Sequence, residues 1–289
     1  MYSASSSDYI KAWLQYPLPQ HALSRITHWL TRREGSAFKD WSIRDFIRRF
    51  GVDMSEAAEP DVRAYPTFNA FFTRSLRAGA RPMAMEADAV VSPVDGAVSQ
   101  MGVIEGGRIF QAKGRWFSTL ELLGGDAAAA AVFKDGAYTT LYLSPKDYHR
   151  IHMPVAGRLY KMLHVPGRLF SVNPPTTRAV PRLFARNERV VCLFDTDIGP
   201  MALVMVGAMN VASIETVWAG EITPPQRRSV RAWDYKDGEV QLDKGAEAGR
   251  FNMGSTVILL FAKDRIRWDV AYGPNSPVRM GRKIATISV

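Results

Sequence analysis

The chain has 289 residues, of which 47% are hydrophobic, and a formal net charge of +9. This length can bury a full core and suits one large domain or two small ones. The positive charge favours an anionic partner. The sequence shows no zinc-finger spacing, no aromatic RNA-binding strand and no long basic run, so we expect no nucleic-acid partner and favour an anionic membrane surface.

Cys192 is the single cysteine, so no disulfide can form within the chain, which is typical of a reducing cytoplasm. No secretory signal is visible at the N-terminus. The longest apolar stretch, 201–214, is too short to span a bilayer as a helix. We therefore expect a peripheral protein on the cytoplasmic side of the cell membrane.

Residues 1–86 are expected to form a helical, membrane-associating region. Apolar residues recur at helical spacing within 23–30. Ser42 is expected to cap a second helix and Thr67 a third. Such stripes usually pack onto a core, but aromatic and arginine side chains together also suit a membrane interface, so both alternatives stay open.

After a boundary near 81–88, short apolar runs alternate with glycine-containing turns. The expected strands are 89–92, 97–103, 108–112, 137–143, 157–163, 190–194, 202–206, 211–216 and 256–261. A helix is expected to begin at Ser144, and 224–249 is expected to be a charged surface loop. We therefore predict an α+β fold, with N-terminal amphipathic helices packed on a β-rich catalytic domain of residues 87–289.

Three places in the chain carry residues suited to nucleophilic catalysis. Ser255 follows Gly254 before an apolar strand, so its hydroxyl is placed to attack the preceding carbonyl. Asp95 lies at a turn, and His149 and His152 are two of five histidines. Together an Asp, a His and a Ser can orient, accept a proton and attack, although each motif alone also has a purely structural explanation. A metal site lacks support, because no cluster of cysteines or carboxylates accompanies the histidines.

Seven segments in order along the chain together resemble bacterial phosphatidylserine decarboxylase, a pyruvoyl-dependent, self-processing family. The segments are FNAFFTR (68–74), SPVDG (92–96), YHRIHMP (148–154), PGRLFSVN (166–173), FARNER (184–189), GA with IETVWAG (207–220) and GST (254–256). Met253 stands where the family usually has leucine, and this exchange nearly conserves side-chain volume.

The resemblance implies decarboxylation of phosphatidylserine to phosphatidylethanolamine and CO2 through a Schiff base. The carbonyl belongs to a covalent pyruvoyl group made from Ser255 by autocatalytic serinolysis, with no pyridoxal phosphate and no metal. Cleavage between Gly254 and Ser255 gives a β chain of residues 1–254 and an α chain of 255–289. Asp95 is implied to orient His152, the base that deprotonates Ser255, and His149 to serve the later decarboxylation.

The loop that holds Phe170 and Ser171 is expected to form a wall of the substrate site. The cleaved chains are expected to stay bound, and the resemblance suggests a homodimer of processed heterodimers. One alternative is a Ser-His-Asp hydrolase that recycles Ser255, although the Gly-x-Ser-x-Gly elbow is missing. Another is a non-enzymatic lipid-binding module, which leaves the Asp95, His152 and Ser255 set without a purpose.

Overall fold

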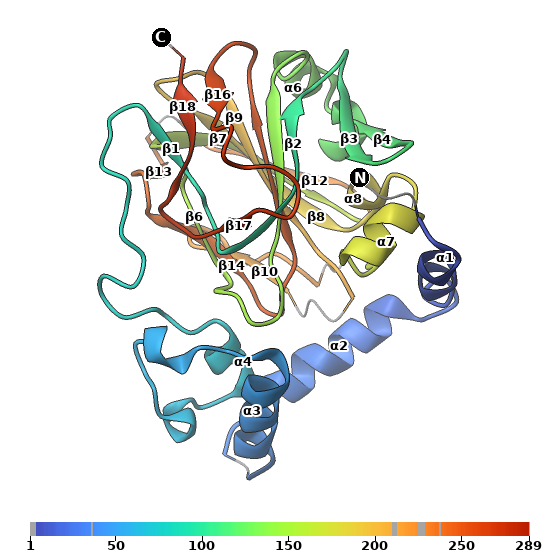
Figure 1. The fold of residues 1–289 in the computed structure, drawn as a ribbon, viewed down its shortest axis with the longest axis vertical. Coiled ribbons are helices and arrows are strands. Elements are labelled where there is room, and N and C mark those ends of the chain that lie inside the picture. The colour runs from blue at the N-terminus through green and yellow to red at the C-terminus, as the bar shows by residue number, and fades with distance from the viewer. Residues whose placement is uncertain (1–3, 36, 210–212, 225–228, 237, 289) are drawn as a thin grey trace.

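The fold comes from a computed structural model that describes residues 4–35, 37–209, 213–224, 229–236 and 238–288. The first helices of the chain lie along one side of a β-rich body (Figure 1). The predicted α+β fold is therefore confirmed. No helix within these ranges is long and apolar enough to cross a bilayer.

Several helices begin where a side chain satisfies free backbone N–H groups, whereas the helices Gln20–Thr31 and Leu183–Arg186 have no side-chain cap. Thr67 caps its helix as predicted, because its Oγ1 accepts a hydrogen bond from the Ala70 N–H at 3.0 Å. The prediction for Ser42 was wrong. It lies inside a helix that begins at Ala37, and its hydroxyl donates to the Lys39 carbonyl. The α-helices are α1 (Ser6–Trp13), α2 (Gln20–Thr31), α3 (Ala37–Phe50), α4 (Phe68–Phe72), α5 (Thr119–Leu122), α6 (Ala127–Val132), α7 (Pro174–Ala179) and α8 (Leu183–Arg186).

The largest sheet is antiparallel, with the strand order β12–β7–β8–β9–β15–β5–β2–β17, and β13 also pairs with β7. Its strands are β2 (Gly96–Val103), β5 (Ala137–Tyr142), β7 (Gly157–Val165), β8 (Arg189–Asp195), β9 (Met201–Val206), β12 (Arg231–Asp234), β13 (Gln241–Leu242), β15 (Thr256–Phe261) and β17 (Pro277–Val278).

Smaller sheets complete the described β-structure. One joins β1 (Ala89–Val91), β18 (Lys283–Ile287) and β16 (Ile266–Trp268). Another joins β11 (Gly220–Glu221), β10 (Ile214–Thr216), β14 (Glu247–Phe251) and β6 (Arg150–His152). The hairpin consists of β3 (Arg108–Ala112) and β4 (Arg115–Ser118).

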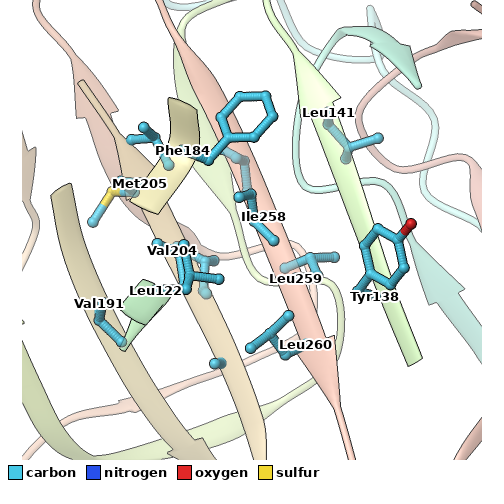
Figure 2. Packing of buried hydrophobic residues seen from close by; sticks show 14 of the residues in the cluster. Leu122, Tyr138, Leu141, Phe184, Val191, Val204, Met205, Ile258, Leu259 and Leu260 are labelled. Atoms are coloured by element: carbon cyan, nitrogen blue, oxygen red, sulfur yellow. The ribbon is translucent and has the colours of Figure 1, made fainter. Parts of the chain in front are cut away.

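Strand β15 lies in the middle of the largest sheet, between β9 and β5. All six of its residues are buried, because both of its faces are covered. Figure 2 shows Ile258, Leu259 and Leu260 of this strand among core side chains such as Val204 and Met205. The segment that follows Ser255 is therefore held by two rows of backbone hydrogen bonds and by the core.

Each predicted strand overlaps an observed one, and the predicted bounds of β3 and β15 are correct at both ends. Residues 211 and 212 of one predicted strand lie outside the described residues. The loop prediction for 224–249 was wrong in part, because β12 and β13 pair with the edge of β7 and β14 pairs with β6.

The helix predicted to begin at Ser144 was also wrong. The Ser144 backbone N–H and hydroxyl both donate to Oδ2 of Asp147, each at 2.7 Å. Side chain to backbone bonding of this kind competes with helix formation and holds a turn instead. The turn brings the residues that follow it back into the body as strand β6.

Helix α1 packs on α7 and fixes the loop before it. Asp8 forms an ion pair with Arg178 at 2.9 Å. The Gln15 side chain accepts from the Ser171 N–H at 2.8 Å and donates to Thr176 at 3.2 Å. The N-terminal helices therefore hold in place a loop that borders the candidate site.

Candidate active site

Ser255 lies immediately before β15 and immediately after Gly254, and only 1% of its surface is exposed. Its hydroxyl donates a hydrogen bond to the Val206 carbonyl on β9. Its own carbonyl accepts from the Leu143 N–H at 2.9 Å, just beyond β5. The hydroxyl is therefore enclosed between two strands and is shielded from bulk water.

His149 is the histidine that lies against Gly254. Its Nδ1 is 2.7 Å from the Asp147 carbonyl oxygen. Because a carbonyl oxygen only accepts, Nδ1 carries the ring proton and Nε2 is left with a free lone pair. This Nε2 is buried and has no hydrogen-bond partner among the described residues. The Phe72 ring, with its centroid 4.1 Å from that of the imidazole, covers it.

Gly254 makes this close approach possible. A Cβ built on Gly254 would lie only 2.5 Å from Nε2 of His149. The backbone of Gly254 does not have a positive φ, so the glycine is needed here for space and not for its conformational freedom. Burial lowers the pKa of His149 to about 3, which leaves the ring neutral at physiological pH.

His152 is bound to other groups. Its Nδ1 is 2.8 Å from the Gly245 carbonyl, and its Nε2 is 3.0 Å from the Tyr148 hydroxyl. Burial lowers the pKa of His152 as well. Both ring nitrogens therefore already have partners, and among the described residues neither partner is Ser255.

Asp95 accepts two hydrogen bonds from Arg81 Nε, at 2.9 and 3.0 Å, and one from Arg81 Nη2. The Met280 N–H donates to the same carboxylate at 2.9 Å. Arg81 also forms an ion pair with Glu56 at 2.6 Å. Within the part of the chain that the structure describes, Asp95 makes no hydrogen bond to His152, so the structure shows a buried carboxylate anchored by an arginine.

An apolar cavity of about 290 Å³ reaches Gly254. Phe46 and Phe50 of α3 line it together with Phe72 and Ser171. Phe170, predicted beside Ser171 as part of the substrate wall, is fully buried and packs on Tyr16, with ring centroids 4.8 Å apart. The cavity therefore joins the helical side of the molecule to the Gly254–Ser255 bond.

The structure thus places His149 against Gly254, the residue before Ser255, and places Asp95 and His152 in separate hydrogen-bond networks. The sequence interpretation missed Phe72 and the Asp147 carbonyl, which hold the His149 ring. Phe72 belongs to the motif FNAFFTR, which could have indicated it. Asp147 contacts His149 through its backbone carbonyl, so the identity of its side chain could not have indicated the contact. Within the described ranges, no group of three or more His, Cys, Asp and Glu residues is placed to hold a metal ion.

Comparisons with known proteins identify the family of the chain. The phosphatidylserine decarboxylase family matches residues 68–286, and a second family, described as PSD, matches residues 10–51. The chain is 61% identical to the phosphatidylserine decarboxylase proenzyme of Alkalilimnicola ehrlichii over 258 residues, which is 89% of this chain and 90% of that protein.

Proteins of the same name from two other bacteria are similar over nearly their full length. The protein of Stutzerimonas stutzeri is 56% identical over 95% of this chain and 93% of its own. That of Bordetella petrii is 57% identical over 94% of this chain and 95% of its own. Since the family match covers most of the chain, this protein belongs to the phosphatidylserine decarboxylase family of enzymes, as its motifs predicted.

Proposed function

We propose that this protein removes CO2 from phosphatidylserine to give phosphatidylethanolamine, after cutting its own chain between Gly254 and Ser255. Family membership supports the reaction, and the name proenzyme carried by the relatives supports the processing. The structural observation that supports it best is the unpartnered Nε2 of His149, which lies against Gly254 in a buried site.

The cleavage uses only groups of the chain and one water. The Ser255 hydroxyl loses its proton, and its oxygen attacks the Gly254 carbonyl carbon while the peptide C–N bond breaks, which leaves an ester. Removal of the Cα proton of residue 255 by a base breaks the bond between Cβ and the ester oxygen, so residue 255 becomes a dehydroalanine and residue 254 a carboxylate. Water then replaces the nitrogen, ammonia leaves, and a pyruvoyl group caps the 255–289 chain.

His149 is placed better than His152 to accept the serine proton. Its free nitrogen lies against Gly254, whereas both nitrogens of His152 are already hydrogen-bonded. Before this proton transfer, the Ser255 hydroxyl must break its hydrogen bond to the Val206 carbonyl and turn toward His149. The role predicted for Asp95 with His152 stays a prediction, and the arginine-bound carboxylate supports a positioning role for Asp95.

A pyruvoyl ketone fits this site and would supply the electron sink that decarboxylation of an amino acid needs, without pyridoxal phosphate or metal. The site fits because residue 255 is enclosed and the neighbouring His149 has an unused polar atom. Apolar walls such as Phe46 and Phe72 disfavour a carboxylate relative to neutral CO2. The chain's own residues thus exclude water and hold a neutral imidazole beside the reacting position.

We also propose that the first helices lie in the surface of an anionic membrane, on the cytoplasmic side. Many large apolar side chains are exposed along these helices, more than the isolated exposed residues that a soluble protein surface normally carries. They are Tyr9, Ile10, Trp13, Leu14, Leu18, Ile26, Trp29, Leu30, Phe38, Trp41 and Phe50. Because Phe46 and Phe50 also line the cavity at Gly254, a lipid headgroup can reach the site while its acyl chains stay in the bilayer.

The membrane proposal is tested by binding to vesicles that contain anionic lipid. Replacing Trp29 and Trp41 by alanine should weaken binding and leave the fold nearly as stable, because the two residues are 55% and 56% exposed. Trp116→Ala, on the β3–β4 hairpin, is the matched control. Salt, and removal of Arg44, Arg48 and Arg49, should also weaken binding. Binding that none of these changes affects would contradict the proposal.

The association of chains follows from the same reasoning. The α chain carries β15, which is buried in the largest sheet, so it should stay bound to the β chain without a covalent link. The predicted homodimer of processed heterodimers remains a proposal from the resemblance, and sedimentation of the processed protein tests it.

A hydrolase that recycles Ser255 is disfavoured. Its hydroxyl is buried and bonds a backbone carbonyl, and Gly254, not Ser255, lines the cavity.

The activity is tested by CO2 release from phosphatidylserine vesicles. We expect the unmodified protein to release CO2, Ser255→Ala to remain a single chain without activity, and Ser99→Ala to behave as the unmodified protein. An active Ser255→Ala chain, or a cleaved protein inactive on phosphatidylserine but active on a simple ester, would refute the proposed function.

A further inference from the structure

Three cavities of the protein meet at one side chain, that of Tyr142 at the end of β5. It lines the cavity of about 290 Å³ that reaches Gly254. It also lines two neighbouring cavities of about 330 and 410 Å³. In the sheet, Tyr142 lies directly opposite Thr256, the residue after Ser255. No step of the proposed cleavage uses this residue.

Among the described residues, no hydrogen bond engages the Tyr142 hydroxyl. The side chain is half-buried, so its hydroxyl is available to a ligand in the cavities that it lines. Two other tyrosines show the contrast: the Tyr138 hydroxyl, on the same strand, donates to the Phe110 carbonyl at 3.2 Å, and that of Tyr148 lies 3.0 Å from His152. Burial, and then the charge of Asp147, raise the pKa of Tyr142, so the phenol keeps its proton at neutral pH.

Four basic and four acidic side chains line the 410 Å³ cavity, and two of the basic ones, Arg74 and Lys146, are available to an anionic ligand near Tyr142. Arg74 is only 5% exposed, and its Nε and Nη1 have no hydrogen-bond partner among the described residues. Lys146 lines the same cavity and forms no ion pair within the described ranges. The nearby Asp147 carboxylate accepts both bonds from Ser144, each at 2.7 Å, so it is already engaged.

We propose that the Tyr142 hydroxyl donates a hydrogen bond to an anionic oxygen of the phosphatidylserine headgroup, either of the carboxylate or of the phosphodiester. This inference rests on the proposed function and names a residue that binds the substrate there. A neutral donor suits the carboxylate in particular, because it orients the group without the strong stabilisation that a cation would give to a charge that must disappear.

The test measures binding to the uncleaved chain, in which the cavities are already formed. The parent is Ser255→Ala, titrated calorimetrically with glycerophosphoserine and with glycerophosphoethanolamine, which lacks the carboxylate. Adding Tyr142→Phe should weaken binding of glycerophosphoserine roughly ten- to a hundredfold, the usual effect of losing a hydrogen bond to a charged group. Adding Tyr138→Phe, which removes the hydroxyl of another tyrosine on the same strand, should leave the affinity within about twofold of that of the parent.

The second ligand identifies the oxygen. If Tyr142→Phe weakens the binding of glycerophosphoserine alone, Tyr142 contacts the carboxylate. If it weakens the binding of both ligands equally, Tyr142 contacts the phosphodiester. Equal affinity in parent and Tyr142→Phe, or a parent that binds neither ligand, overturns the proposal. So does a Tyr142→Phe chain with an intact Ser255 that fails to cleave, because the phenol would then act in processing. Cleavage of Ser255→Ala itself would instead refute the proposed function.

Discussion

Replacing Gly254 by alanine tests whether His149 acts at the bond that is cut. The added Cβ would lie 2.5 Å from Nε2, 3.1 Å from Cδ2 and 3.6 Å from Cε1 of His149. Ordinary contact begins at 3.4 Å, so the ring must retreat by about 0.9 Å, which is 3.4 − 2.5. The ring has little freedom to do so, because Phe72 covers it and its Nδ1 is bonded to the Asp147 carbonyl.

Two magnitudes follow from this clash. Overpacking a dense interior costs about 1–3 kcal/mol of unfolding free energy. A misplacement of about 1 Å between reacting groups reduces a rate on the order of 100-fold. We therefore expect Gly254→Ala to fold with reduced stability and to cleave its chain on the order of 100 times more slowly.

The assay follows the appearance of the two chains by denaturing gel and intact mass after synthesis of the protein. Gly273→Ala is the matched control, because no atom lies within 4 Å of its added Cβ and its φ is not positive. This control should cleave at the normal rate. Cleavage of Gly254→Ala at the rate of the unmodified protein would refute the placement of His149 at the scissile bond.

Two further predictions concern buried charge. Arg81→Met should destabilise the fold by about 3–5 kcal/mol in urea unfolding, because it leaves the Asp95 charge buried without its partner. Arg48→Met, which removes an ion pair of a 78% exposed arginine, should cost far less, and equal costs would contradict this account. Because the folded pKa of His149, about 3, lies below the ordinary imidazole pKa of 6.5, the unfolded chain binds the extra proton, and stability falls as the pH drops below about 6.5. His149→Gln should remove up to about 1.4 kcal/mol per pH unit of that fall, and an unchanged pH dependence of urea unfolding would contradict the neutral, buried ring.

Local patterns predicted the central strands of the largest sheet, but not β12, β13 and β17 at its edges and not the contacts that build the site. The uninterrupted apolar run of β15 could only be a buried strand, and its bounds were predicted correctly. The helix expected at Ser144 failed because the Asp147 side chain bonds back to the backbone, which a cap-and-proline pattern does not reveal. The charged composition of 224–249 likewise predicted a loop where β12 lies, because the partner strand β7 is distant in sequence.

The candidate site divides in the same way. The motifs identified Ser255, Gly254 and both histidines, because histidines are few in this chain and the four residues together suit the chemistry. Which histidine meets Gly254 depends on the path of the chain between β6 and β15 and on a missing Cβ, neither of which the spacing encodes. The anchoring of Asp95 by Arg81 likewise depends on how residues 73–88 fold back over the body.

The central claim is that the chain cuts itself before Ser255, and the intact mass of the purified protein under denaturing conditions tests it most directly. The account predicts two species, residues 1–254 and residues 255–289, with the smaller one carrying a carbonyl in place of its terminal amine. Ser255→Ala should give one species of full length. A single full-length species from the unmodified protein, under conditions that allow processing, would contradict the account.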